Sequence, residues 1–364
     1  MKRLALCCDG TWNRADQEEN HAPCPTNVVR LAYRIAKRAP DGTLQVTYYD
    51  QGVGTGNLLD HVSGGAFGEG LEDNIYDGYR FLVANYEPGD EIYLFGFSRG
   101  AFTARSLAGM IRKCGILSRE SVTRYRDALA LYRNDQHPDD AGPAGFRASY
   151  SVCGTDGVKI KLIGVWDTVG ALGIPLRGLR WLTRRDYRFH DTELSGAVEH
   201  AYHALAVDER RAPFEPTLWY YKPKPSQHVE QVWFCGVHSD VGGGYAEVGL
   251  SDVALQWMME KAEHAGLSLD PRSTATYPTH PDARGRLHNS KTGLYRLTPG
   301  SDRRIGVKVE REGGSADEPG AAHDMDPTQS LHPTVLERWD GDPTYRPGAL
   351  RAYFARTGDP RAKD

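Results

Sequence analysis

The chain contains the stretch Gly96-Phe97-Ser98-Arg99-Gly100, which follows the apolar run 92–95 and leads directly into residues 101–107. The apolar run predicts a buried strand, and the residues after the stretch predict a helix. A G-x-S-x-G turn between a strand and a helix is typical of a serine hydroxyl lifted above a sheet. Side chains at the two glycine positions would crowd the neighbouring strand and helix. The stretch therefore predicts a nucleophilic Ser98, with an ordinary tight turn as the alternative.

Apolar runs and helical patterns alternate through the first two-thirds of the chain. Strands are expected at 4–8, 46–49, 92–95, 158–165 and 232–237. Helices are expected at 27–37, 70–86, 101–113, 121–132, 194–206 and 251–265. Strands that are apolar on both faces and alternate with helices are typical of a parallel sheet covered on both sides. The pattern predicts an α/β fold with a mainly parallel sheet.

The simplest domain organisation is a single α/β-hydrolase-like domain over residues 1–364, with its core at about 1–270. Residues 172–191 mix Gly, Pro, Trp and Arg without periodicity, so we expect a cap insertion at about 172–230. Residues 271–364 are rich in Pro, Gly, Asp, Arg and His. They predict a loop-rich C-terminal extension whose short elements pack against the sheet.

The overall charge argues against nucleic acid as a partner, because 44 basic and 48 acidic side chains leave a net charge of −4. Arginines cluster locally between Arg177 and Arg188 and at Arg303 and Arg304. We expect these clusters to be solvated surface, with a patch for anionic lipid or a partner as the alternative.

No stretch approaches the ~20 apolar residues that a membrane-spanning helix needs. Residues 1–9 begin with basic residues, but their apolar segment is too short for a signal peptide. The six cysteines lack C-x-x-C spacing and are too sparse for a disulfide scaffold. The chain is therefore expected to be cytoplasmic as synthesised.

A nucleophilic serine needs a base, and the base needs an acid to orient it. In α/β hydrolases these partners follow in the order serine, carboxylate, histidine. Asp167 comes directly after the apolar segment 160–166, where catalytic groups gather at the carboxyl edge of a parallel sheet. We expect Asp167 to be the acid, with Asp156 and Asp208 as weaker alternatives.

The predicted base is His238, which follows the apolar run 232–237 and enters a glycine-containing loop at 239–244. We expect this loop to be flexible enough to place the imidazole over the serine. Asp240 is expected to brace the loop through local backbone hydrogen bonds. The other histidines lie in less suitable positions, and His200 and His203 are expected to share a helical face.

An oxyanion hole requires two backbone N–H groups near the serine. Arg99, the residue after the nucleophile, is expected to supply one of them. Gly10 or Thr11, after the first strand, is the candidate for the other, with Asp9 in a supporting role.

Two further motifs suggest other chemistry. Asp9-Gly10-Thr11 is similar to a phosphatase motif with a nucleophilic aspartate and magnesium, but its first aspartate is replaced by Cys7. Residues 52–56 are glycine-rich but lack the G-K-[ST] ending of a phosphate-binding loop, so we expect a turn at the edge of the site. We expect no cofactor and no metal site, because no ligand spacing requires one.

Five motifs together are similar to a known family. They lie in the expected order at Cys8–Asn13, Gly96–Gly100, Gly164–Gly170, His203–Arg210 and Gly236–Tyr245. The chain resembles the bacterial and fungal α/β-hydrolase domain of unknown function whose best-studied members are lipase effectors of type VI secretion. The resemblance implies Ser98 as nucleophile, Asp167 as acid and His238 as base.

The resemblance also implies ester hydrolysis, with phospholipids as the substrate class of the effectors. The implied partners are a lipid or other ester, a peripheral membrane contact, and a secretion or immunity protein if the chain is an effector exported by type VI secretion. The sequence suggests a catalytic domain with a modest tail, without the effectors' large membrane-binding module.

Several alternatives stay open. The same three residues fit a thioesterase, acyltransferase, peptidase or small-ester esterase, and the frame fits an inactive binding protein. A metal-dependent phosphohydrolase at Asp9 is a further alternative. Glu209, Arg210 and Arg211 are expected to form a structural ion-pair cluster after a helix.

Overall fold

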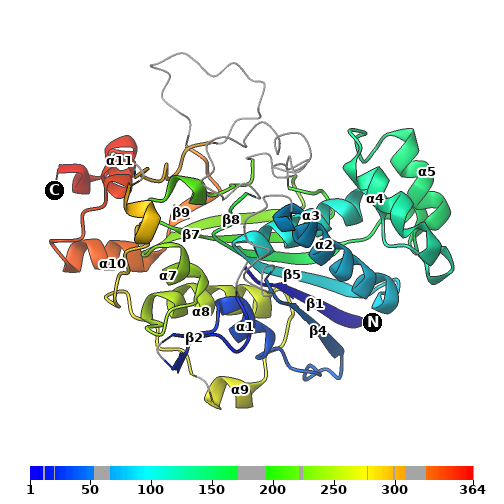
Figure 1. Ribbon diagram of the computed structural model, residues 1–364, viewed down its shortest axis with the longest axis horizontal. Helices are drawn as coiled ribbons and strands as arrows, with labels where there is room; N and C mark the ends of the chain where they lie inside the picture. The colour runs from blue at the N-terminus through cyan, green and yellow to red at the C-terminus, as the bar shows by residue number, and fades with distance from the viewer. Residues whose placement is uncertain are drawn as a thin grey trace.

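The computed structural model describes residues 1–10, 13–19, 21–52, 66–170, 194–220, 224–276, 278–297, 300–308 and 325–363. Seven parallel strands form its main sheet, in the order β4-β1-β5-β6-β7-β8-β9 (Figure 1). These strands are β1 (Lys2–Cys8), β4 (Leu44–Asp50), β5 (Glu91–Phe97), β6 (Ile160–Trp166), β7 (Val198–Ala206), β8 (His228–Phe234) and β9 (Gln329–Leu331). A separate antiparallel pair joins β2 (Glu18–Glu19) and β3 (Ala22–Pro23).

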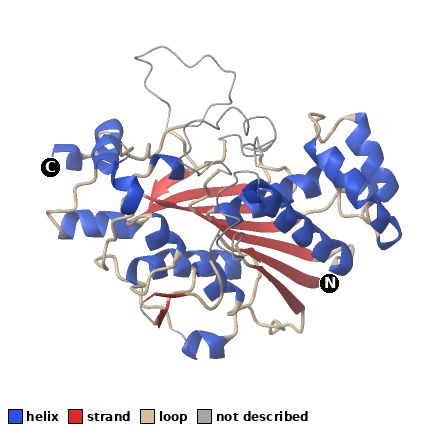
Figure 2. Cartoon of the chain, viewed as in Figure 1, coloured by secondary structure: helices blue, strands red, loops and turns tan. Residues whose placement is uncertain are grey.

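Helices cover both faces of the sheet (Figure 2). The α-helices are α1 (Asn27–Ala32), α2 (Ala66–Asn85), α3 (Arg99–Cys114), α4 (Tyr125–Arg133), α5 (Ala141–Tyr150), α7 (His238–Gly242), α8 (Gly249–His264), α9 (Pro271–Thr276), α10 (Pro333–Gly341) and α11 (Gly348–Thr357). Short 3-10 helices are η2 (Arg119–Arg124), η3 (Gly154–Asp156), η4 (Ala212–Phe214), η5 (Gly293–Leu297) and η6 (Pro360–Lys363). The expected fold class, an α/β-hydrolase-like fold with a mainly parallel sheet, is confirmed.

Strand β1 shows why these strands have few polar positions. Leu4 and Leu6 point into the core beneath α2 and α3, whereas Ala5 and Cys7 point into the core beneath α1 and α8. Because successive side chains of a strand point to opposite faces, a strand covered by helices on both sides must be apolar throughout. This double burial produces the continuous apolar runs that the sequence shows.

The carboxyl ends of the central strands meet at one edge of the sheet. Cys8 of β1 lies opposite Gly96 of β5, and Phe97 lies opposite Trp166 of β6. The residues that follow these ends are Asp9, Ser98 and Asp167, so the register brings these three positions together.

One expected helix is wrong. Residues 198–206 form strand β7, in register between β6 and β8. Alanine and leucine favour a helix in isolation, but burial on both faces removes the alternation that marks a strand. Strand β7 also lies inside the range expected for a cap, so this part of 172–230 belongs to the core sheet.

Other expectations need smaller corrections. Helix α1 ends at Ala32 rather than near residue 37, and the expected helix 121–132 consists of η2 followed by α4. The C-terminal extension packs against the sheet as expected, but it contains strand β9 and helices α10 and α11. These helices form a third core in which Trp233 and Leu205 meet Trp339 and Phe354.

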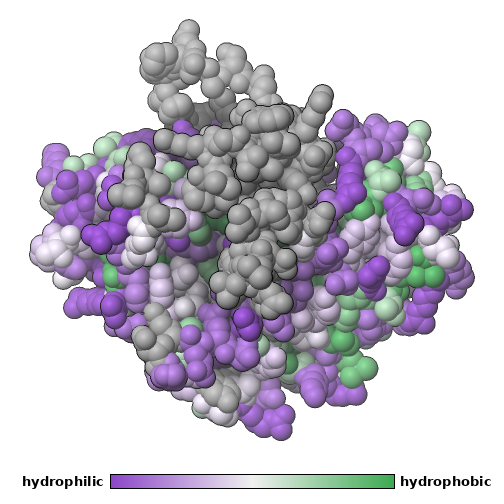
Figure 3. All heavy atoms as spheres, in the orientation of Figure 1, coloured by the Kyte–Doolittle hydropathy of each residue, from purple (hydrophilic) through white to green (hydrophobic). Residues whose placement is uncertain are grey.

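Several predictions concern residues outside the described ranges. They include Thr11, the first part of the expected cap (residues 172–191) with the arginines from Arg177 to Arg188, and most of the glycine-rich segment 52–56. Among the described residues, no helix is both long and apolar enough to cross a membrane. Hydrophilic side chains cover most of the described surface visible in Figure 3.

Candidate active site

Ser98 occupies the turn between β5 and α3. Its backbone has φ 57° and ψ −120°, and helix α3 begins at the next residue. A positive φ is strained for a residue with a side chain, and such strain is found where a structure holds a functional group in place. The Ser98 amide donates to the Trp166 carbonyl at 3.0 Å, which ties the turn to the end of β6.

Glycines flank this turn because other backbone segments approach them closely. A Cβ atom on Gly96 would lie 2.4 Å from the Gly100 carbonyl oxygen. On Gly100 it would lie 2.1 Å from the carbonyl oxygen of Cys8, on β1. Both separations are far shorter than a non-bonded contact, so a side chain at either position requires the backbone to move.

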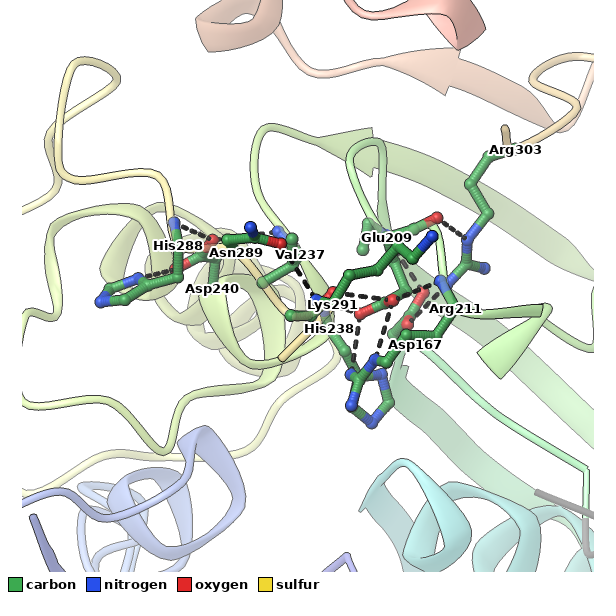
Figure 4. A network of polar contacts seen from close by, with 12 residues as sticks. Asp167, Glu209, Arg211, Val237, His238, Asp240, His288, Asn289, Lys291 and Arg303 are labelled. Carbon is green, nitrogen blue, oxygen red and sulfur yellow. Dashed lines mark hydrogen bonds and ion pairs between the residues drawn. The ribbon is translucent and has the colours of Figure 1, made fainter. Parts of the chain in front are cut away.

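The structure brings Asp167 and His238 together. The Asp167 carboxylate lies 2.6 Å from Nδ1 of His238, and both side chains are buried (Figure 4). The other carboxylate oxygen of Asp167 accepts a hydrogen bond from the Ala206 amide at 3.1 Å. Asp167 therefore holds the imidazole by Nδ1, which leaves Nε2 as the nitrogen available for proton transfer.

His238 is the first residue of the short helix α7, not part of a flexible loop as expected. Its ring lies between two aromatic rings, with centroids 4.5 Å from Phe97 and 5.0 Å from Phe214. The His238 amide also donates to the Glu209 carboxylate at 3.3 Å. Packing rather than loop motion therefore sets the position of this imidazole.

Asp240 supports the same helix, as the sequence suggested. One of its oxygens accepts from the Val237 amide at 3.0 Å, a local backbone hydrogen bond. Asp240 also contacts His288, which approaches with its Nδ1 at 2.6 Å and donates its amide at 3.2 Å. Figure 4 shows these contacts beside the His238 pair. Asp240 thus links α7 to the C-terminal extension.

Arg303 is a part of this network that the sequence did not reveal. Its Nη2 donates to the Asp167 carboxylate at 3.1 Å, and its Nε donates to the Glu209 carbonyl at 3.2 Å (Figure 4). Arg303 is only 6% exposed, so the expected surface position is wrong for this residue. Its neighbour Arg304 has a side chain 76% exposed and fits the surface interpretation.

The charges around Asp167 keep it ionised. Burial by itself would raise the pKa of the Asp167 carboxyl, because a buried charge loses its hydration. The positive charge of Arg303 and the hydrogen bond from His238 outweigh burial and lower this pKa to about 2. Asp167 is therefore a carboxylate throughout the neutral pH range.

Glu209 and Arg211 form the expected ion pair, although they follow strand β7 rather than a helix. The Arg211 guanidinium donates from Nε at 2.9 Å and from Nη2 at 2.8 Å. Arg211 also lies over the ring of Phe214, at 3.5 Å from its centroid. The pair therefore fixes Glu209 and Phe214, both of which contact His238.

Gly10 lies beside the serine, but its amide is engaged. A Cβ on Gly10 would lie 3.2 Å from the Ser98 Cβ, whereas the Gly10 N–H donates to the Asp9 carboxylate at 2.7 Å. Gly10 can therefore act as an oxyanion donor only after this hydrogen bond breaks. Thr11, the other candidate, lies outside the described residues.

Asp9 acts as a local anchor. Its carboxylate accepts hydrogen bonds from Thr26 and Tyr49, each at 2.8 Å. Burial raises the pKa of the Asp9 carboxyl to about 6, although these hydrogen bonds favour the charged form. The anchor joins the end of β1 to the start of α1.

Within the described ranges, no group of three or more His, Cys, Asp or Glu residues is placed to hold a metal ion.

The alternative acids lie elsewhere. Asp156 is in η3, and Asp208 accepts hydrogen bonds from the Gly236 amide at 2.7 Å and the Tyr345 hydroxyl at 2.9 Å. Burial raises the pKa of the Asp208 carboxyl to about 6. The imidazole of His238 faces Asp167 instead.

His200 and His203 do not share a helical face. Both belong to β7, and three residues apart on a strand they point to opposite faces. The His203 ring is completely buried, and its Nε2 accepts a hydrogen bond from the Thr168 amide at 3.1 Å. The His203 ring therefore holds Thr168, the residue after Asp167, and does not act as a second base.

A cavity of about 680 Å³ is lined by Val237, Arg210, Lys291, Asp302 and Tyr345 among others. Ser98, Asp167 and His238 are not among the described residues that line it.

Comparisons with known proteins identify the family of the chain. A family model described as the catalytic domain of Tle1-like phospholipase effectors of type VI secretion matches residues 2–261. An uncharacterized protein of Saccharomyces cerevisiae, YEL023C, is 34% identical over 241 residues. That alignment covers 59% of this chain and 32% of the yeast protein, so the chain spans about a third of its relative.

Two solved structures are also similar. A crystal structure of an uncharacterized protein from Pseudomonas aeruginosa has a TM-score of 0.45 and 20% identity, covering 76% of this chain and 48% of that chain. A structure of the Tle1 effector bound to the VgrG spike of the type VI secretion system has a TM-score of 0.38 and 21% identity. It covers 68% of this chain and 52% of that chain.

The match to residues 2–261 confirms the family resemblance read from the sequence motifs. By this match, the chain belongs to the Tle1-like catalytic-domain family of type VI secretion phospholipase effectors.

Proposed function

We propose that this protein is a serine ester hydrolase of the lipase or phospholipase type. The observation that carries the proposal is the buried 2.6 Å contact between Asp167 and Nδ1 of His238, at the sheet edge where Ser98 sits in its strained turn. Family membership supports the same activity. A nucleophile, an orienting acid and a base in this chain order are the parts that acyl transfer requires.

The proposed reaction has two steps. In the first, Nε2 of His238 takes the proton from the Ser98 hydroxyl while Oγ attacks the ester carbonyl carbon. The imidazolium returns this proton to the departing alcohol, which leaves an acyl group on Ser98. In the second step, water attacks the acyl carbon, His238 takes its proton, and the acid product leaves as Ser98 regains a proton. Asp167 stabilises the imidazolium in both steps.

The N-terminus of α3 supports charge stabilisation at the carbonyl oxygen. Arg99 is the first residue of this 16-residue helix, so its backbone N–H belongs to the helix end at which the N–H groups point away from the helix body. The helix dipole also favours negative charge at this end. We assign one oxyanion donor to the Arg99 amide, and Gly10 or Thr11 remains the proposed source of the other.

The test is removal of the hydroxyl in Ser98→Ala. We expect turnover of a short p-nitrophenyl ester to fall by about 10⁴-fold or more, because the acyl-enzyme can no longer form. Ser106→Ala, which removes a buried hydroxyl from helix α3, is the matched control and should keep its activity. If Ser98→Ala kept turnover, the proposal would fail.

Two measurements separate the alternatives. Labelling of Ser98 by a fluorophosphonate distinguishes an active hydrolase from an inactive binding protein. Initial rates on matched oxygen esters, thioesters and amides, followed by analysis of products released from mixed phospholipids, then identify the substrate class. Export by type VI secretion, contact with a membrane and binding of an immunity protein stay predictions from the family.

A further inference from the structure

We propose that Arg303 is a positioning residue for catalysis and that the C-terminal extension completes the active site. This inference rests on the proposed function, because it assumes that Asp167 and His238 work as acid and base. Arg303 lies outside residues 2–261, which the family model matches. The site assembled from the family region would therefore lack one of its buried charges.

The contacts of Arg303 define its role. Its guanidinium spans two groups, the Asp167 carboxylate at 3.1 Å and the Glu209 carbonyl at 3.2 Å. The same oxygen of Asp167, Oδ2, also contacts Nδ1 of His238. Arg303 thus contacts the atom that orients the imidazole, and it anchors that atom to the turn after β7.

Burial makes this contact consequential. The side chain of Asp167 is fully buried, and that of Arg303 is 4% exposed, so water screens their attraction very little. A carboxylate buried without a cation would lose its hydration and gain little in return. The Arg303 charge keeps Asp167 ionised, and its fixed geometry prevents the carboxylate from turning away from His238.

Other charged groups around the pair do not replace Arg303. Glu209 is an acid, and its carboxylate is already held by the bidentate Arg211. The His203 ring is neutral, since burial lowers its pKa to about 3. In the proposed mechanism His238 is positively charged while it holds the serine proton, so its charge is transient. Among the described groups facing Asp167, Arg303 is thus the permanent cation in hydrogen-bond contact with it.

The geometry favours arginine over lysine. A guanidinium presents several N–H groups in a rigid plane and can reach two acceptors at once. An ammonium group at the end of a flexible stem keeps the charge but cannot reproduce both contacts in the same orientation. Charge and geometry can therefore be separated by two substitutions at one position.

The experiment measures kcat/KM against pH on a short p-nitrophenyl ester for the wild type, Arg303→Met and Arg303→Lys. Asp167 and His238 form a coupled pair, and a pair that loses a nearby positive charge binds a proton more readily. We expect Arg303→Met to lose about 10- to 100-fold in kcat with little change in KM, and its acid limb to move up by about one pH unit. Arg303→Lys should restore the acid limb but only part of kcat.

Arg304→Met is the matched control, because the Arg304 side chain is 76% exposed and forms a long contact of 4.0 Å with the Glu215 carboxylate. It should keep both the rate and the pH profile of the wild type. A folded Arg303→Met with an unchanged acid limb would overturn the proposal. Should Arg303→Met not fold, Arg303→Gln replaces it in the same assay. Failure of both variants to fold would assign Arg303 a purely structural role and overturn the proposal as well.

Ser98→Ala keeps this test independent of the proposed function. If Ser98→Ala is inactive and Arg303→Met matches the wild type, only the role of Arg303 is wrong. If Ser98→Ala retains turnover, the triad assignment itself is wrong.

Discussion

Ser98 and its neighbouring glycines show how single residues set the geometry of this site. Its positive φ carries a cost of about 1–3 kcal/mol, which surrounding contacts must offset. One such contact is the hydrogen bond from its amide to Trp166. Another is the close approach of Gly100 to β1, which brings the start of α3 against the carbonyl groups of Cys8 and Asp9.

Gly100→Ala tests this close approach. A Cβ 2.1 Å from the Cys8 carbonyl oxygen forces the backbone apart. We therefore expect the free energy of unfolding to fall by about 2 kcal/mol, and the esterase activity to fall as well. Urea unfolding measures the first effect. Gly145→Ala is the control, because a Cβ on that exposed helical glycine would meet no atom within 4 Å, and alanine there should stabilise by about 0.5–1 kcal/mol. Equal stabilities of the two variants would contradict this account.

The sequence could predict the positions of Ser98, Asp167 and His238 for one physical reason. Each of them follows an apolar run, and the carboxyl ends of parallel strands meet at one edge of the sheet. It could not predict Arg303, because no run or spacing connects that residue to a partner 136 positions earlier. The neighbouring Arg303 and Arg304 look identical in sequence, and only packing separates the buried one from the exposed one.

At the scale of elements, β7 is the instructive error. The apolar and alanine-rich residues 198–206 fit a helix by propensity, and only burial between β6 and β8 makes them a strand. Helix α7 is the opposite case, since the glycine run 242–244, which begins at its last residue, suggested a loop. The segment is instead held by Asp240 and by packing against Phe97, whose ring a Cβ on Gly242 would overlap.

Strand β7 also gives the protein a measurable pH dependence. Burial lowers the pKa of His203 to about 3, whereas an unfolded histidine has its ordinary value near 6.5. Below pH 6.5 the unfolded chain takes up a proton that the folded chain refuses, so stability falls as the pH falls. This contribution is complete above pH 6.5 and is lost progressively down to about pH 3.

His203→Gln isolates the effect, because the amide oxygen can still accept from Thr168 but does not titrate. Between pH 7 and pH 5, the stability of the wild type relative to this variant should fall by about 2 kcal/mol. Urea unfolding at several pH values measures the difference in the free energy of unfolding between the two proteins. Buried carboxyl groups are the same in both, so their opposing contributions cancel. His137→Gln, at a side chain 65% exposed, is the control. Parallel pH curves for the wild type and His203→Gln would refute the assignment.

At the scale of the molecule, the C-terminal extension belongs to the same body as the sheet. Trp339 and Phe354 are completely buried, with ring centroids 4.9 Å apart, and they share a core with Trp233 of β8. Strand β9 extends the sheet beyond β8. In Figure 1 the last helices cover the end of the sheet opposite β4. Stability should therefore depend on residues outside the sequence range 2–261 that the family model matches.

Trp339→Ala tests that dependence. Loss of a fully buried tryptophan should reduce the free energy of unfolding by about 3–5 kcal/mol in a single transition, because the cavity cannot be refilled. Urea unfolding followed by circular dichroism provides the measurement. Val122→Ala, at a position 44% exposed, should change stability by less than about 0.5 kcal/mol. A second, separate transition in Trp339→Ala would show that the C-terminal core unfolds on its own.

The ion pair between Asp167 and Arg303 has a consequence for synthesis. During translation, Asp167 is synthesised 136 residues before Arg303, the cation that pairs with it. A nascent chain that has emerged only as far as helix α7 holds the proposed serine, acid and base, but not the cation. On the proposed role of Arg303, full catalytic competence therefore requires synthesis to continue at least through residue 303.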